Sequence, residues 1–265
     1  MKAVVLIILI LSFASATRAN DTRPAALTGV GIDQRLNEQV PLDLVFRDEA
    51  GKSVRLGDYF GSKPVILALV YYRCPMLCTL TLNGLERTMR VMPLDVGNQY
   101  TVVTVSFDPH ETAALAAAKK KEYLAHYERP GGAAGWHFLT GEESSIRLLT
   151  EVVGFHYNYD PQSGQYAHTT GLIVLTPQGK IARYFYGVEF SPRDLRLSLV
   201  EASANKIGSP VDEILLFCFH YDPATGKYGL AIMRVIQIAG AITVLALGSF
   251  MTLMLLRERE SRFRT

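Results

Sequence analysis

The chain has 265 residues, of which 49% are hydrophobic and 20% are charged. This length allows one domain with a substantial hydrophobic core, together with additional segments. The net charge is +2 at pH 7, and residues 257–265, with four Arg and two Glu, account for all of it. Since a nucleic-acid binder needs a basic face on its folded domain, we expect no nucleic-acid partner.

Residues 1–19 have the pattern of a secretory signal peptide. Lys2 precedes an apolar run at 3–11, which is too short for a bilayer-spanning helix of about 20 residues. Ala14-Ser15-Ala16 then matches a small-x-small cleavage pattern. We expect cleavage after Ala16 or after Ala19, with an uncleaved anchor as the alternative.

Residues 235–256 form an uncharged apolar run of 22 residues. As a helix the run would extend about 33 Å, which predicts one C-terminal transmembrane helix. A buried soluble helix is the alternative. The arginines of the tail at 257–265 predict that this tail stays in the cytoplasm. We therefore expect a protein of the cell inner membrane whose soluble domain lies on the outer, periplasmic face.

Between these ends we expect a polar tether at 20–39, a folded domain at 40–208 and a juxtamembrane segment at 209–234. Apolar periodicity and the positions of Gly and Pro predict the elements of the domain. In chain order they are a hairpin formed by 40–46 and 53–56, a buried strand at 64–72, a helix at 77–92, a strand at 100–107, a helix at 111–127, a short strand at 136–139, a helix at 142–153, a turn-rich loop at 157–167, a hairpin of strands at 168–175 and 181–186, and a helix at 191–206. A parallel βαβ unit followed by an antiparallel hairpin predicts an α/β fold with a mixed sheet flanked by helices.

The three cysteines are Cys74, Cys78 and Cys218. A close pair with one odd cysteine in an exported domain indicates redox or metal chemistry rather than a disulfide scaffold. If Cys74 and Cys78 both lie in the first turns of the helix after the buried strand, their sulfurs share one face. The helix N-terminus favours their thiolate forms, which bind metals and attack disulfides. Buried structural cysteines, or a plain disulfide, are the alternatives.

His168 follows the turn-rich loop and is expected to open the first strand of the second hairpin. In a thioredoxin-type arrangement, this point faces the start of the helix that carries the cysteines. The remaining histidines of the domain have no comparable position and are treated as incidental: His110, His126, His137 and His156.

Three segments, at 70–78, 106–112 and 166–180, resemble motifs of the Sco/SenC family of copper proteins, in the same order. The first contains the Cys-Pro-x-x-Cys pattern, the second is similar to a Ser-x-Asp-Pro-x-x-Asp-Thr pattern, and the third is similar to the histidine strand and its following hairpin. The resemblance covers about residues 40–208. It implies a thioredoxin-like fold and delivery of copper to the dinuclear CuA site in the copper-bearing subunit of cytochrome c oxidase.

The resemblance also implies that Cys74, Cys78 and His168 are the copper ligands. The chain departs from the family pattern at Met76, where an acidic residue is common, and at Thr79, where Pro is common. A C-terminal anchor is a further departure, because the family's usual anchor is N-terminal. None of these departures removes a ligand.

Two thiolates and an imidazole suit Cu(I) in a three-coordinate site, whereas zinc would take a fourth ligand. The sequence leaves open whether Cu(I), Cu(II) or both are bound. We expect a metallochaperone rather than an enzyme. The alternative is a thiol–disulfide oxidoreductase that uses Cys74 and Cys78 as a redox disulfide to reduce the cysteines of an oxidase subunit. A peroxidase, with Arg73 as the activating residue, is a more distant alternative.

Cys218 and His220 form a second, weaker pattern, because residues i and i+2 of a strand point to the same side. They predict an auxiliary copper site near the membrane. The favoured alternative is an interfacial stretch whose aromatic residues lie at the bilayer surface.

Overall fold

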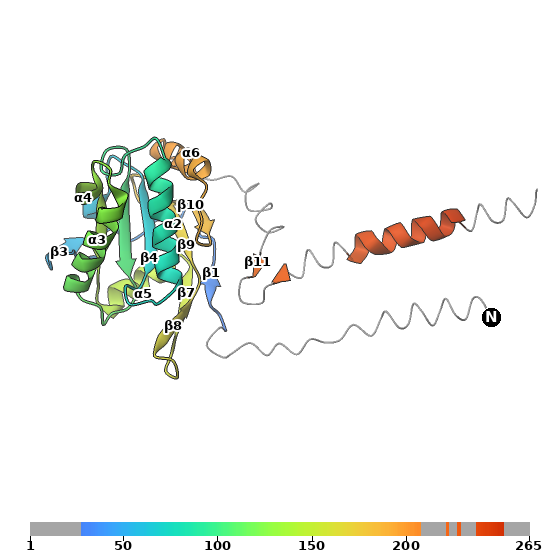
Figure 1. The fold of residues 1–265 in the computed structure, drawn as a ribbon, viewed down its shortest axis with the longest axis horizontal. Coiled ribbons are helices and arrows are strands. Elements are labelled where there is room, and N and C mark those ends of the chain that lie inside the picture. Colours follow the sequence, from blue (N-terminus) through green and yellow to red (C-terminus); the bar gives the residue numbers. More distant parts are fainter. Residues whose placement is uncertain (1–27, 208–220, 223–226, 229–236, 252–265) are drawn as a thin grey trace, which may run out of the picture.

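The computed structural model describes residues 28–207, 221–222, 227–228 and 237–251. Its central sheet has five strands in the order β10-β9-β4-β5-β6, and Figure 1 shows them at the centre of the folded body. The strands are β4 (Val65–Val70), β5 (Thr101–Ser106), β6 (Trp136–Leu139), β9 (Gly171–Leu175) and β10 (Ile181–Tyr186). β4, β5 and β6 are parallel, and β9 is antiparallel to both β4 and β10. The predicted mixed α/β sheet is confirmed.

The register of β4 and β5 determines where the following segments meet. The pairs run from Val65 with Thr101 to Val70 with Ser106, so the two strands end at the same level. All six residues of β4 are buried, as expected for a strand covered on both faces. Beyond the last pair, the N–H of Phe107 still donates to the carbonyl of Val70 at 2.8 Å. The segments that leave β4 and β5 therefore start side by side at one edge of the sheet.

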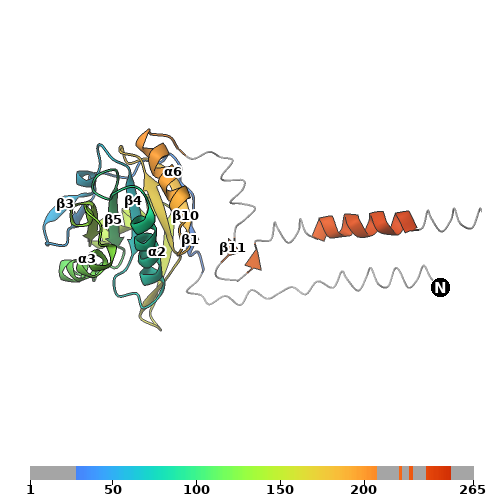
Figure 2. The same ribbon diagram turned by 45° about the horizontal axis from the view of Figure 1, so that its top comes forward.

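Three helices form a layer on the sheet. They are α2 (Leu77–Val91), α3 (Ala113–Tyr127) and α6 (Pro192–Ser203), and α2 packs against both of the others, as the turned view in Figure 2 shows. Gly84 of α2 permits one close approach, since a Cβ atom there would lie 1.9 Å from the carbonyl oxygen of Val188. The shorter α4 (Gly132–Gly135) packs against β6, and α5 (Glu143–Val152) packs against β7.

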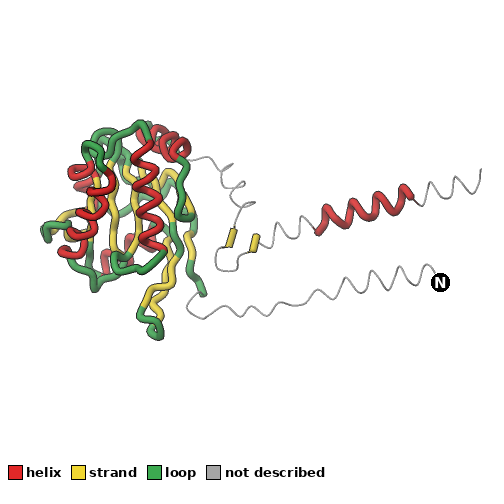
Figure 3. The backbone as a smooth tube through the Cα atoms, viewed as in Figure 1, coloured by secondary structure: helices red, strands yellow, loops and turns green. Residues whose placement is uncertain are grey.

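Two smaller antiparallel sheets flank this body. The predicted first hairpin is confirmed as β2 (Val45–Arg47) and β3 (Ser53–Arg55), followed by the 3-10 helix η2 (Leu56–Tyr59). The other sheet pairs β1 (Gly31–Ile32) with β7 (Phe155–Asp160), and β7 with β8 (Gln165–His168). The tube in Figure 3 shows β7 and β8 as a hairpin that projects from the body.

The predicted loop at 157–167 is therefore wrong, since most of it belongs to the β7–β8 hairpin. Only the connection between Asp160 and Gln165 is a turn, with Gly164 at φ +67°. Phe155 to Asp160 does alternate apolar and polar side chains as a strand does, but the turn residues Pro161 and Gly164 that follow favour a loop. His168 consequently ends β8 instead of opening the following strand, which begins at Gly171.

In the C-terminal part, β11 (Tyr221–Asp222) pairs with β12 (Lys227–Tyr228), and residues 237–251 are helical. Among the described helices, none combines the length and the apolar character required to cross a membrane. The described helix lies inside the predicted span at 235–256, whose remaining residues are outside the described part. The predicted signal peptide at 1–19 also lies outside it.

Candidate metal centre

Cys74 and Cys78 lie in the connection from β4 to α2. Cys78 is in the first turn of α2, whereas Cys74 belongs to the segment before the helix, where its N–H donates to the Tyr71 carbonyl at 3.2 Å. The two cysteines therefore do not both lie in the helix. The Cys74 sulfur nevertheless lies close to the start of the helix. The N–H of Cys78 donates a hydrogen bond to it at 3.4 Å. Both cysteines are free thiols.

His168 reaches the two cysteines from the end of β8. Its Nε2 lies 3.8 Å from the Cys74 Sγ and 3.5 Å from the Cys78 Sγ. Its Nδ1 lies 2.7 Å from the carbonyl oxygen of Thr169. Because a carbonyl only accepts, Nδ1 carries the proton, and in the neutral ring the lone pair of Nε2 faces the two sulfurs. This second contact of the ring is the arrangement typical of a metal-binding histidine.

These three side chains form a compact, buried group. Their candidate ligand atoms all lie within 4.8 Å of one another, and the residues are 8%, 3% and 9% exposed for Cys74, Cys78 and His168. The ring of His168 packs edge-on against Tyr71 and Phe107, with centroids 5.6 and 5.3 Å away. Two sulfurs and one imidazole nitrogen fit a soft ion with three ligands, since zinc would normally require a fourth.

The two thiols have opposite pKa shifts. The hydrogen bond from the Cys78 thiol lowers the pKa of Cys74 well below its usual range, and the N–H groups of Cys78 and Met76 lower it further, against the effect of burial. Burial raises the pKa of Cys78, and the neighbouring Cys74 raises it further. In the metal-free protein the pair therefore carries one negative charge, on Cys74.

Glu111 holds the backbone that leads to Cys74. Its carboxylate accepts hydrogen bonds from the N–H of Tyr72 and of Arg73, both at 2.7 Å, and from the Ser106 hydroxyl at 2.6 Å. Glu111 is only 6% exposed, and burial raises its pKa while these three hydrogen bonds oppose the shift. Glu111, in the segment after β5, thus holds the segment after β4 in place through hydrogen bonds. The two segments are neighbours because β4 and β5 end at the same level.

The sequence motifs included Ser106 and Glu111 but assigned them no role. The signal in the sequence that could have identified Glu111 is an acidic residue in the segment directly after the strand predicted at 100–107. Nothing in the sequence indicates the contact between His168 and the Thr169 carbonyl, because it depends on where β8 ends.

No other side chain of the described residues joins this group. Within the described ranges, Cys74, Cys78 and His168 are the one group of His, Cys, Asp and Glu side chains that could hold a metal ion. The Nε2 of His156 instead lies 3.0 Å from an oxygen of Asp33 on the surface. Cys218 and His220 lie outside the described residues, so their predicted auxiliary site stays a prediction.

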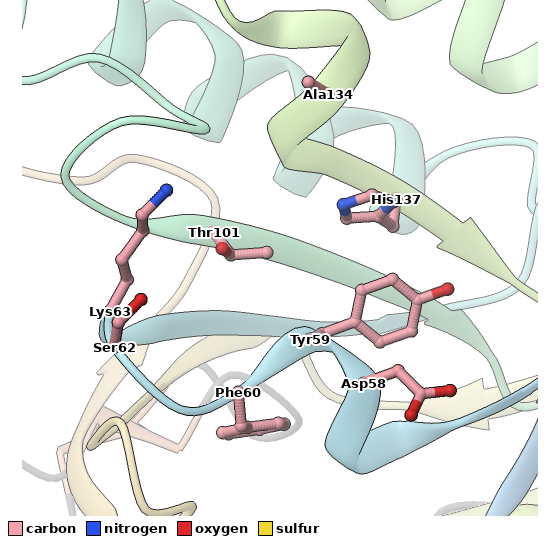
Figure 4. A pocket seen from close by; sticks show the side chains of 8 residues that line it. All are labelled: Asp58, Tyr59, Phe60, Ser62, Lys63, Thr101, Ala134 and His137. Carbon is pink, nitrogen blue, oxygen red and sulfur yellow. The ribbon is translucent and has the colours of Figure 1, made fainter.

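A separate cavity of about 320 Å³ lies at the opposite end of the sheet. Ser62, Lys63 and Thr101 line it beside the start of β4 and β5, and Tyr59 and His137 face each other across one end (Figure 4). The rings of Tyr59 and His137 have centroids 4.5 Å apart. Since the cysteines follow the carboxyl end of β4, this cavity is not part of the metal centre.

Comparisons with known proteins agree with the motifs. The sequence profile described as SCO1/SenC matches residues 33–202. The SCO1 protein homolog of Bacillus subtilis (strain 168) is 26% identical over 189 residues, which cover 68% of this chain and 90% of that protein.

Two solved structures share the fold. Arabidopsis thaliana ScoI, crystallised with copper bound, is 18% identical with a TM-score of 0.50, over 61% of this chain and 96% of that chain. BsSco, described as a member of the Sco family of cytochrome c oxidase assembly proteins with a disulfide switch, is 22% identical with a TM-score of 0.51, over 66% of this chain and 99% of that chain. The predicted thioredoxin-like Sco fold is confirmed. Because the family profile covers more than half of the sequence, the chain belongs to the SCO1/SenC family.

Proposed function

We propose that this protein is a copper chaperone, which binds copper through Cys74, Cys78 and His168 and delivers it to the CuA site of cytochrome c oxidase. The observation that carries the proposal is the convergence of two sulfurs and one imidazole nitrogen within 4.8 Å. Soft ligands of this kind favour Cu(I). The copper-bound ScoI structure and the oxidase-assembly description of BsSco support the choice of ion and of acceptor.

We also propose that residues 235–256 anchor the protein in the cell inner membrane, with the metal centre on the periplasmic side. The described helix at 237–251 supports this, because its large apolar side chains are 59–70% exposed in the isolated chain. Such a surface is unfavourable in water and favourable in hydrocarbon.

The test is a Cu(I) titration of the full chain in detergent, in competition with a chromogenic Cu(I) chelator. We expect one Cu(I) per chain, and a loss of affinity of more than about 100-fold in Cys74→Ala and in Cys78→Ala, since removal of a residue that only hydrogen-bonds to a metal ligand already costs 10- to 100-fold. His168→Ala should also weaken binding. His156→Ala is the matched control and should bind like the parent. Cysteine variants that bind as tightly as the parent would refute the proposed copper function.

The second candidate is a thiol–disulfide oxidoreductase that reduces the cysteines of an oxidase subunit. It is favoured by the lowered pKa of Cys74, since the thiolate is the attacking species in disulfide exchange. His168 discriminates between the two functions, because exchange between thiols and disulfides does not require an imidazole ligand. A His168→Ala variant that loses Cu(I) affinity but reduces a peptide disulfide at the parent's rate would show that the pair has this activity independently of copper.

A further inference from the structure

Met76 is an exposed apolar residue between the two cysteines. The residue is 62% exposed, whereas Met89, near the other end of the helix, and Met92, directly after it, are 0% and 1% exposed. Burial of a methionine side chain is worth about 1.5–3 kcal/mol, and Met76 forgoes most of that gain. Packing of the core therefore does not explain a methionine at this position.

Met76 is also a poor residue for the start of a helix. It occupies the N-cap position of α2, and its side chain makes no capping hydrogen bond. Ser, Thr, Asp or Asn at this position would satisfy a free N–H of the first turn and contribute about 1 kcal/mol. Met76 therefore departs both from the burial usual for methionine and from the polar residues usual at an N-cap. Such departures are expected at functional sites.

Met76 lies midway between the two cysteines in the connection that leads into α2. Because the N–H of Cys78 donates to the Cys74 sulfur at 3.4 Å, this connection closes on itself, and Met76 starts two residues from either sulfur-bearing residue. Cys74, Cys78 and His168 are each at most 9% exposed, whereas Met76 lies at the surface. A soft thioether thus lies at the surface, two residues from each of the buried cysteines.

The chemistry of the thioether suits an exchangeable ligand. Its sulfur is soft, uncharged and carries no proton, and the methionine side chain has three rotatable bonds with which to follow an ion. We propose that Met76 is a fourth Cu(I) ligand that binds the ion during entry and release; this rests on the proposed copper function. In the exchange step the bond from Cu(I) to the Met76 Sδ forms as the bond to the His168 Nε2 breaks. The copper stays Cu(I), and no proton or electron is transferred.

The competing explanation for an exposed Met76 is an apolar contact with a protein partner. Leu77 and Leu80 are exposed beside it, at 36% and 43%, and would belong to the same contact. Met76→Leu distinguishes the two explanations, because leucine retains the apolar surface and lacks the sulfur. Because Met76 is exposed and makes no cap, this variant should fold like the parent, which its thermal unfolding curve would verify.

The experiment measures Cu(I) release from the full chain in detergent to bicinchoninate by stopped flow, so no protein partner is present. We expect Met76→Leu to slow release at least about tenfold, a rise of about 1.4 kcal/mol in the barrier, with the equilibrium affinity within about threefold of the parent. Leu80→Ala, which removes apolar surface but no sulfur, is the matched control and should release Cu(I) at the parent's rate.

A second readout is the NMR signal of the methionine methyl groups, labelled with carbon-13. We expect one equivalent of Ag(I), a diamagnetic substitute for Cu(I), to shift the Met76 methyl signal and to leave those of Met89 and Met92 in place. Unchanged release kinetics in Met76→Leu, together with an unshifted Met76 methyl signal, would overturn this inference and leave the copper function intact. A parent chain that binds no Cu(I) would overturn both.

Discussion

At the scale of single residues, the unequal protonation of two neighbouring thiols is the main chemical feature of the metal-free protein. Cys78 donates its proton toward Cys74, and N–H groups of Cys78 and Met76 also point to the Cys74 sulfur. Cys78 is more deeply buried and keeps its proton. Only one further proton has to leave when a metal ion takes both sulfurs, which favours binding at neutral pH.

This asymmetry predicts the pH dependence of alkylation. Because the pKa of Cys74 in the folded protein lies below its ordinary value, its thiolate persists as the pH falls from 8 to 6. We expect iodoacetamide to modify Cys74 of the copper-free protein at nearly equal rates at the two pH values. An ordinary cysteine, with a pKa of about 8.5, would slow by about two orders of magnitude. Peptide mass spectrometry would measure the modified fraction.

Cys78→Ala is the control for this prediction, because it removes the thiol that donates to Cys74. The pKa of Cys74 should rise, and alkylation of the variant should slow markedly between pH 8 and pH 6. If Cys74 of the parent already slows like an ordinary cysteine, the proposed charge distribution is incorrect.

At the scale of elements, the metal centre depends on a connection between two loops that follow neighbouring strands. Glu111, in the segment between β5 and α3, binds the N–H groups of Tyr72 and Arg73 in the segment between β4 and α2. The parallel register of the two strands brings these segments together. A buried carboxylate that satisfies two backbone donors also prevents the loss of stability that unpaired buried N–H groups would cause.

We predict that Glu111→Gln destabilises the protein by about 1–3 kcal/mol, because the amide group presents a donor where two N–H groups need acceptors. Urea denaturation followed by tryptophan fluorescence would measure the loss, and Trp136, the single tryptophan, is fully buried. Glu122→Gln is the matched control, since Glu122 is exposed and pairs with its helix neighbour Lys119; it should change stability by less than about 0.5 kcal/mol. Equal unfolding midpoints for Glu111→Gln and the parent would contradict the role assigned to Glu111.

At the scale of the whole molecule, copper binding and folding are linked. The two cysteines and His168 are 90 or more residues apart in the chain, so the unfolded chain does not hold them together. A ligand that binds only the folded state at 1,000 times its Kd stabilises that state by about 4 kcal/mol. Bound copper should therefore link the start of α2 to the end of β8 and stabilise the folded state.

We predict that one equivalent of Cu(I) raises the Tm of the full chain in detergent by about 10 °C, from a shift of about 2–4 °C per kcal/mol for a domain of this size. Removal of the metal with excess chelator should return the Tm to its initial value. The double variant Cys74→Ala, Cys78→Ala should show no rise on addition of Cu(I). A parent whose Tm does not respond to Cu(I) would contradict binding at this site.

The sequence alone determined the local elements and the identity of the candidate ligands. The apolar run of β4, the Cys-Pro-x-x-Cys segment and the capped helices follow from patterns within a few residues, because propensity and burial periodicity act at short range. The motif resemblance likewise indicated His168, and the family profile confirmed the resemblance.

Only the tertiary structure decided how these parts meet. The β7–β8 hairpin was not predicted, because the turn residues Pro161 and Gly164 between its short strands favour a loop. The position of His168 at the end of a strand depends on this hairpin. The contacts of Glu111 with Tyr72 and Arg73, and of the His168 ring with the Thr169 carbonyl, depend on strand order and register. These properties result from packing between segments that are distant in the chain, which no local pattern of residues encodes.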